Sequence, residues 1–193
     1  MSLTLIFGKK TPTNDHTKSI VYAAVSIAMS FALSYLRFFR MPQGGSITFV
    51  SILPLMLYSY MFGIRKGVLA GFIYGLMQAL QDPWILHPLQ FLLDYPMAFA
   101  MIGLAGLFRY FPAFKNKIVL QFIAGGILIA ILRYCCHVIT GIIVFDMYAA
   151  EGFNAVTWGF VYNLFVFADA AIAIFAGSLM LISKAFVKQI QSI

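Results

Sequence analysis

The chain has 193 residues, of which 62% are hydrophobic and only 10% are charged. Soluble globular domains are about half apolar and about a quarter charged, so the composition excludes a soluble protein and predicts a single-domain integral membrane protein. The net charge of +7 arises from basic residues that flank apolar segments, where they set topology and meet anionic headgroups, and we expect no nucleic-acid partner.

Six apolar stretches are candidates for helices that cross the hydrocarbon core of a bilayer, which is about 30 Å thick. They cover 19–38, 47–63, 67–81, 88–109, 117–145 and 155–184. The second, which contains Pro54, and the third are short, so we expect them to be tilted, broken or partly buried. The predicted fold class is an all-α integral membrane protein with six transmembrane helices. Residues 1–18 form an N-terminal tail, 19–185 the membrane domain and 186–193 a C-terminal tail.

The predicted loops alternate in charge. One side of the membrane holds Lys9, Lys10, Lys18, Arg65, Lys66, Arg109, Lys115, Lys117, Lys184 and Lys188. The other side holds only Arg37 and Arg40. Because basic loops remain in the cytoplasm, we expect both termini there, with 40–46, 81–88 and 146–152 as the outer loops.

A row of small residues marks the first predicted span. Ala24, Ala28 and Ala32 recur every four residues and therefore share one face of a helix. Small residues in a row let another helix approach closely. The row indicates either packing inside the protein or a docking strip for a partner membrane protein.

The first outer loop contains a glycine pair in the sequence PQGGS. Its residues are Pro42, Gln43, Gly44, Gly45 and Ser46. The loop lacks the Lys-Ser/Thr that completes a phosphate-binding P-loop. We expect a mobile lid over a pocket, with the glycines as hinges.

A carboxylate stands in the apolar stretch FLLDYPMAFAMIGLAGLF (91–108). With a rise of about 1.5 Å per residue, Asp94, His137 and Asn163 all lie about 10–12 Å below the outer surface, on three different helices. A charge at the bilayer centre costs about 2.5–3.5 kcal/mol, so Asp94 is expected to face inward. Two interpretations follow, a hydrogen-bonded clamp between helices or a ligand pocket.

Aromatic side chains near that level favour the pocket. Tyr95 follows Asp94, and Trp158 and Tyr162 share a face of the sixth span. One stripe of the fifth span consists of Arg133, His137, Gly141 and Phe145. An aromatic stripe alone is more often part of a core. A carboxylate among rings, however, suits a flat organic cation, because each ring adds about 0.5–2 kcal/mol of cation–π attraction.

Two further charges lie deeper, since Arg133 and Asp169 are about 18 and 21 Å below the outer surface. They are expected to pair as a structural floor below the pocket, or else Arg133 reaches up to the ligand.

Four segments together resemble the thiamine-specific membrane subunit of energy-coupling factor (ECF) transporters, the ThiT/YuaJ family. They are PQGGSI (42–47), HPLQFLLDYPMAFAMIGLAGLF (87–108), RYCCHVITGIIVF (133–145) and VYN (161–163). The resemblance runs from about residue 20 to 185. It implies a six-helix substrate-capture protein of a prokaryotic cell membrane, which is not an enzyme, needs no cofactor and binds thiamine near the outer face beneath a lid.

The resemblance also implies roles for individual residues. Asp94 faces the positive charge of the ligand with Tyr95 beside it, His137 stacks on or bonds to a ring, Gly141 gives room, and Asn163 bonds to the pyrimidine. The alanine strip docks onto a transmembrane coupling subunit that carries two ATPases. Phe145 and Trp158 depart from the family, since better-known members have Trp and Tyr there, and Asp94 is one carbon shorter than the Glu of some members.

Other functions remain open on the sequence alone. The same architecture suits a thiamine precursor or riboflavin, although neutral riboflavin leaves Asp94 without a charge partner. An intramembrane hydrolase using Asp94 and His137 lacks a second carboxylate at their level, and a channel or structural protein is a further alternative. The chain has no Walker motif, so any ATP is used by another chain.

Overall fold

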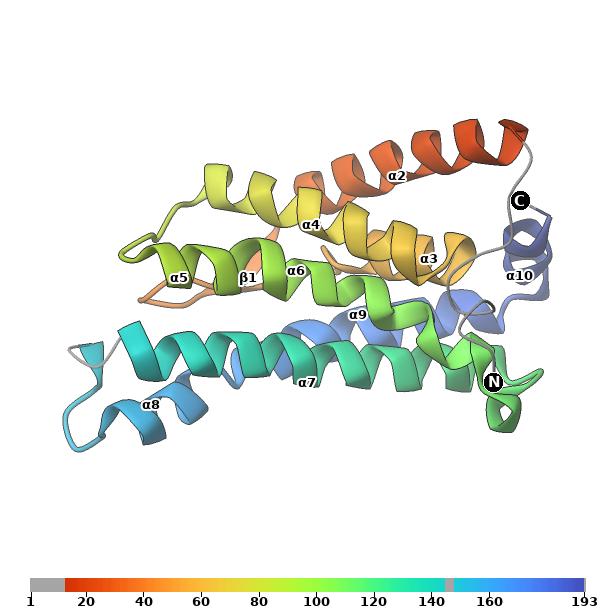
Figure 1. Cartoon of the computed structure of the whole chain (residues 1–193). Helices are drawn as coiled ribbons and strands as arrows, with labels where there is room; N and C mark the ends of the chain where they lie inside the picture. Colours follow the sequence, from red (N-terminus) through yellow and green to blue (C-terminus); the bar gives the residue numbers. More distant parts are fainter. Residues whose placement is uncertain (1–12, 145–147, 193) are drawn as a thin grey trace.

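The computed structural model of the chain describes residues 13–144 and 148–192. Its helices run roughly alongside one another in an elongated bundle that includes one short β-hairpin (Figure 1). The elements in chain order are α2 (Thr13–Leu33), β1 (Arg37–Arg40), β2 (Ser46–Thr48), α3 (Leu53–Phe62), α4 (Ile64–Gln81), α5 (Pro88–Leu92), the π-helical turn η1 (Leu93–Met97), α6 (Ala98–Ala100), the 3-10 helices η2 (Met101–Tyr110) and η3 (Pro112–Phe114), α7 (Ile118–Val144), α8 (Ala155–Tyr162), α9 (Phe165–Ile182) and α10 (Lys184–Gln191).

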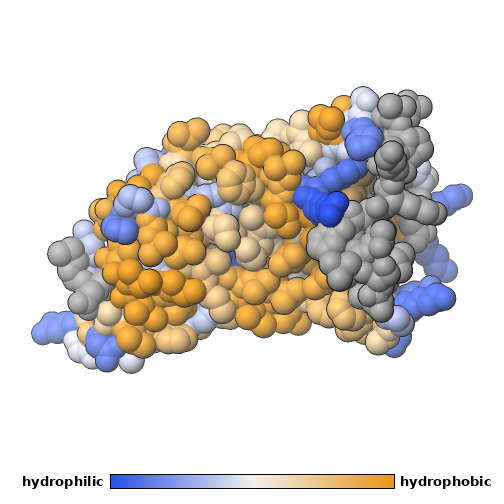
Figure 2. All heavy atoms as spheres, viewed as in Figure 1, coloured by the Kyte–Doolittle hydropathy of each residue, from blue (hydrophilic) through white to orange (hydrophobic). Residues whose placement is uncertain are grey.

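Within the described residues, four helical stretches are long and apolar enough to cross a membrane. They are His16–Leu33, Pro88–Tyr110, Ile118–Val144 and Ala155–Ile182. A further apolar helix, α3, has only 10 residues, in line with the short second span that the sequence predicts. Figure 2 shows apolar side chains over the middle of the molecule and hydrophilic ones toward its two ends. The protein is therefore a mostly helical membrane protein.

The prediction of a purely helical fold is wrong at the junction of the first two predicted spans. The span predicted at 19–38 is helical only as far as Leu33, and the one predicted at 47–63 becomes helical only at Leu53. The intervening strands, RFFR and SIT, contain phenylalanine, isoleucine and threonine, which favour β structure. Hydropathy alone does not separate the two conformations.

The two strands form an antiparallel hairpin, residues 37–48, which we call the hairpin. Arg37 pairs with Thr48, and the register shifts between Arg37 and Phe39. Gly45 at the turn has a φ of +85°, a conformation that glycine adopts without steric cost.

The fourth predicted span is present as one helical stretch, Pro88–Tyr110, but its winding changes at a proline. Pro96 has no N–H and cannot continue the α-helical hydrogen-bond ladder. The N–H of Ala98 instead bonds to the carbonyl of Leu93, which is the spacing of a π-helix. The resulting wide turn, η1, carries Asp94.

The sixth predicted span is divided at Asn163 and Leu164 into α8 and α9. The predicted boundary between the membrane domain and the C-terminal tail 186–193 falls inside α10, which contacts α9. The α10 side chains that pack against the core are Phe186, Val187 and Ile190. The part of the predicted tail that carries these residues is therefore a helix packed against the core.

Helix α2 lies at the edge of the bundle (Figure 1), where it contacts α3 and α4. Only 11% of its apolar window is buried. Ala24, Ala28 and Ala32 are all exposed, so the alanine strip does not pack against the described part of the chain. It remains accessible to another molecule.

Candidate functional site

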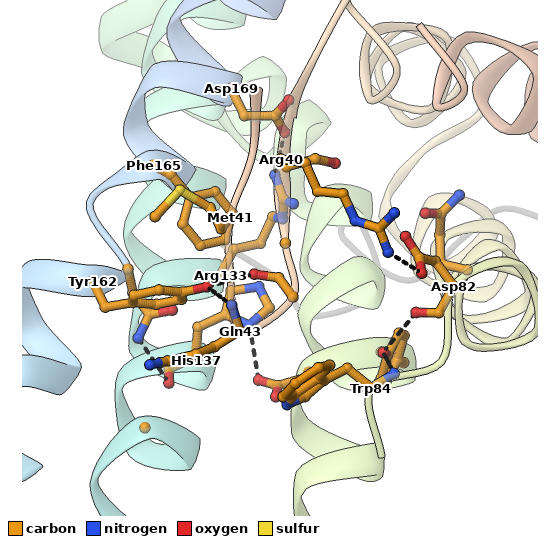
Figure 3. A pocket seen from close by; sticks show the side chains of 18 of the residues that line it. Arg40, Met41, Gln43, Asp82, Trp84, Arg133, His137, Tyr162, Phe165 and Asp169 are labelled. Carbon is orange, nitrogen blue, oxygen red and sulfur yellow. Dashed lines mark hydrogen bonds and ion pairs between the residues drawn. The ribbon is translucent and has the colours of Figure 1, made fainter. Parts of the chain in front are cut away.

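A cavity of about 400 Å³ lies between the hairpin, the start of the Pro88–Tyr110 stretch, and helices α7, α8 and α9. Its volume falls in the range of about 300–1,000 Å³ that is usual for ligand pockets. The sequence-predicted residues that line it are Asp94, Tyr95, Arg133, His137, Gly141, Trp158, Tyr162, Asn163 and the loop residues Pro42, Gln43, Gly44, Gly45 and Ser46. Phe145 lies outside the described residues. Figure 3 shows the labelled members of the lining set.

The carboxylate of Asp94 is paired inside the cavity wall. Its Oδ1 lies 2.8 Å from Nδ1 of His137, and the two side chains are only 16% and 13% exposed. The pair joins η1 to α7, so part of the interhelical clamp that the sequence suggests is present. The cavity lies beside the pair, so clamp and pocket coexist.

Asn163 was predicted at the same depth as Asp94 and His137, but it does not bond to the Asp94 carboxylate. Its side-chain amide donates to the carbonyls of His137 (3.2 Å) and Gly159 (2.8 Å). The interaction fixes the break between α8 and α9 against α7. Gly141 has a related role, since a Cβ there would lie 3.1 Å from the Cα of Gly159. Its missing side chain therefore admits helix α8, and the residue also lines the cavity.

The floor of the cavity is a buried ion pair, as the sequence suggests. Arg133 Nη1 lies 3.2 Å from Asp169 Oδ2, and both side chains are 4% exposed. The other carboxylate oxygen accepts hydrogen bonds from the backbone N–H (3.0 Å) and hydroxyl (2.7 Å) of Thr48. The guanidinium also lies over the ring of Phe99, 5.1 Å from its centroid. This network attaches the base of the hairpin to α7 and α9.

The hairpin is also attached along its first strand. Arg37 and Arg40 reach the two oxygens of Asp82 at 2.6 and 2.7 Å, and all three residues line the cavity. Figure 3 shows the Arg40–Asp82 pair. Asp82 follows α4, so the interaction clips the hairpin to the connection between α4 and α5. The sequence analysis missed this pair, because nothing in the spacing of RFFR and QDPW indicates that the two segments meet.

The hairpin turn closes onto the aromatic wall of α8. The backbone N–H of Gln43 donates to the hydroxyl of Tyr162 (2.7 Å), which donates to the carbonyl of Gly44 (2.9 Å). The Trp158 indole N–H donates to the side-chain oxygen of Gln43 (3.1 Å). Residues 42–46, predicted as a lid loop, therefore form the hairpin turn and the first residue of β2, and they cover the cavity on this side.

Tyr95 and Trp84 build the remaining wall. The Tyr95 hydroxyl accepts from the backbone N–H of Trp84 (2.9 Å) and donates to the carbonyl of Asp82 (3.2 Å). The side chain of Gln90 bonds to the Trp84 carbonyl and accepts from the backbone N–H of Leu86 (2.8 Å). Tyr95 thus presents its ring to the cavity while its hydroxyl holds the loop that carries both Trp84 and Asp82.

The chemistry of the site is that of binding. No group of three or more His, Cys, Asp or Glu side chains that could hold a metal ion occurs within 13–144 and 148–192. The cavity combines a paired carboxylate, three aromatic side chains that share polar contacts with the hairpin and loop, and an ionic floor. Such a site can accept a flat, partly aromatic molecule with a positive charge.

Comparisons with known proteins bear on the family and the fold. Residues 20–190 match the family model described as thiamine transporter protein (Thia_YuaJ). The thiamine transporter ThiT of Bacillus subtilis is 34% identical over 133 residues, which cover 65% of this chain and 69% of that protein. ThiT of Lacticaseibacillus paracasei is 28% identical over 169 residues, 79% of each chain.

Two solved structures show the same architecture. The structure of ThiT from Listeria monocytogenes superposes with a TM-score of 0.77 at 21% identity and covers 89% of this chain and 97% of its own. The S component of a bacterial ECF transporter superposes with a TM-score of 0.53 at 19% identity, covering 83% and 94%. At these identities the likeness establishes the fold of an ECF S component.

The family match extends over most of the chain and includes every described residue of the cavity wall. It assigns the protein to membrane transport, so the intramembrane hydrolase considered from Asp94 and His137 is wrong. We conclude that the chain belongs to the thiamine transporter (Thia_YuaJ) family.

Proposed function

We propose that this chain is the substrate-capture subunit of an ECF-type transporter and that it binds thiamine in the cavity beneath the hairpin. The observation that carries the proposal is the carboxylate of Asp94 in the wall of a 400 Å³ cavity that is also lined by Trp158 and Tyr162. Thiamine contains a cationic thiazolium ring and an aminopyrimidine ring. A buried carboxylate stabilises the first, and aromatic faces accept both.

The proposed contacts divide among the walls of the cavity. Asp94 offsets the thiazolium charge, while His137 remains in contact with the carboxylate and offers its ring for stacking. Asn163 has further hydrogen-bonding capacity for the pyrimidine, since its amide oxygen is an acceptor. Tyr95, Trp158 and Tyr162 enclose the rings. The hairpin turn, 42–46, acts as the lid.

We further propose the course of the chain through the membrane. Six crossings correspond to α2, α3, α4, the Pro88–Tyr110 stretch, α7 and the α8–α9 pair, as predicted from the sequence. The excess of basic residues in one set of loops supports cytoplasmic termini, which puts the cavity at the outer face. The proposed partners are a transmembrane coupling subunit and two ATPase subunits, with α2 as the docking helix.

Purified protein titrated with thiamine tests the binding proposal. Trp84 and Trp158 both line the cavity, so their fluorescence should change and saturate as thiamine fills it. Riboflavin and biotin serve as controls and should leave the signal unchanged. Saturation by riboflavin without any response to thiamine would show that the site takes a different vitamin.

The docking strip is tested by Ala28→Trp. Ala28 is exposed on α2, so a large side chain there should leave thiamine binding intact but abolish thiamine uptake by cells that contain the other subunits. The matched control is Met29→Trp, since Met29 is 51% exposed on the same helix but lies about 100° away around it. Equal uptake by both variants, or lost binding in Ala28→Trp, contradicts the docking role.

A further inference from the structure

The hairpin, whose turn was predicted as a lid at the outer surface, reaches deep into the molecule. At its base, Arg37 pairs with Thr48, and Thr48 bonds to Asp169, the partner of Arg133. Arg133 lies eleven residues before Val144, the last residue of α7, which corresponds to a depth of about 16 Å along the helix axis. Figure 1 shows β1 within the length of α7. The base of the hairpin is therefore level with the middle of a helix that crosses the membrane.

That depth places β structure at the level of the hydrocarbon core. The 27 residues of α7 extend about 40 Å, similar to a bilayer with its headgroups. Non-helical backbone is tolerated at such a depth only where it lines a cavity or is buried, with its polar groups paired. Polar groups at the base of the hairpin are paired inside the protein: Thr48 N–H donates to Asp169, and Phe49 N–H, directly after the hairpin, donates to the carbonyl of Leu36 (2.8 Å).

The other side of the hairpin is apolar and exposed. Phe38 is 64% exposed, Phe39 56% and Phe49 48%, and the rings of Phe38 and Phe49 lie 5.7 Å apart. A regular strand points successive side chains to opposite faces. The register shift between Arg37 and Phe39 interrupts this alternation, as a bulge does, and lets two consecutive phenylalanines remain exposed.

The phenylalanine surface continues that of the neighbouring helix. Between α2 and β1, Tyr35 and Leu36 are 61% and 56% exposed. Farther along α2, Val25 and Met29 are also about half exposed, on a helix that is apolar enough to cross the membrane. A contiguous apolar surface of this kind marks an interaction site, and its continuity with a membrane-crossing helix identifies lipid as the occupant.

We propose that the hairpin is a membrane-embedded wall of the cavity, with Phe38, Phe39 and the adjoining Phe49 in contact with lipid acyl chains. Its inner side carries Arg37 and Arg40 against Asp82, and its outer side rests in the leaflet at the cavity end of the bundle. The cavity is then separated from lipid by a single two-stranded layer. Any outward movement of the hairpin displaces three aromatic side chains within the bilayer.

Spin labels at the three phenylalanines test this placement. Phe38→Cys, Phe39→Cys and Phe49→Cys are each made in a Cys135→Ala/Cys136→Ala background, because both native cysteines are free, and are reconstituted into liposomes. Collision with oxygen reports contact with lipid, and collision with a water-soluble nickel chelate reports contact with water. We expect oxygen to be favoured over nickel several-fold at all three positions.

Two control labels calibrate the measurement. Val25→Cys lies on the exposed side of α2 and should favour oxygen, whereas Glu151→Cys lies on the exposed connection before α8 and should favour nickel. Labels at 38, 39 and 49 that behave like the one at Glu151 would overturn the proposal. Labels that collide with neither reagent would overturn it as well, because protein and not lipid would then cover them. Thiamine is not present in the experiment, so its outcome is independent of the ligand assignment.

Discussion

Replacing Asp94 with asparagine is expected to weaken thiamine binding by about 100-fold. The substitution keeps the size of the side chain but removes the charge that we propose offsets the thiazolium. Losing one partner of a desolvated charge pair costs about 2–5 kcal/mol, and about 2.7 kcal/mol corresponds to a factor of 100 in Kd. Equilibrium titration of the two proteins in the same detergent measures the change.

Two controls separate the charge effect from a change in shape. Asp94→Glu keeps the carboxylate and should retain most of the affinity. The neutral aminopyrimidine half of thiamine should bind Asp94→Asn almost as well as the wild type, because it presents no cation to the carboxylate. Similar losses for thiamine and for the neutral fragment would indicate that Asp94 acts only by holding His137, at 2.8 Å, in place.

Asp169→Asn is expected to have the largest effect on stability, lowering it by about 3–5 kcal/mol, the cost of leaving a buried charge without its partner. Asp169 and Arg133 are both 4% exposed. Asparagine still offers an oxygen to Thr48, so the lost charge pair dominates the change. Thermal unfolding of the purified protein should shift down by about 10 °C.

The double variant Arg133→Met/Asp169→Asn is the matched control. It removes the stranded guanidinium along with the carboxylate and should recover much of the loss, since replacing both members of a buried pair is often nearly neutral. If the double variant is less stable than Asp169→Asn alone, the arginine contributes through its contact with Phe99 rather than through the ion pair.

The long apolar helices and the buried carboxylate could be predicted because both follow from the properties of the bilayer. A membrane-crossing helix requires an apolar stretch of a certain length, as in α7, which is described over Ile118–Val144, inside the predicted 117–145. A charge in such a stretch needs a cavity or a partner. Asp94 has both, and the same argument pairs Arg133 with Asp169.

The hairpin and the broken helices could not be predicted in the same way. The strands RFFR and SIT are too short for the alternation of a strand to be recognised, and the phenylalanines of RFFR read as a continuation of the first predicted span. The attachments to Asp82 and Tyr162 join segments about 40 and 120 residues apart in sequence. Such contacts depend on how the helices pack, which a single sequence does not encode in any local pattern.

Beyond its base, the hairpin is held closed by two attachments of different chemistry. One is ionic and partly exposed, since Arg40 is 64% and Asp82 38% accessible where they meet. The other consists of neutral hydrogen bonds, from the Gln43 N–H to the Tyr162 hydroxyl and from the Trp158 indole N–H to the Gln43 side chain. Dissolved ions screen exposed charges strongly and neutral hydrogen bonds little. Concentrated salt should therefore weaken the attachment of β1 to Asp82 while the turn stays bonded to α8, whereas in dilute buffer both attachments hold the hairpin closed.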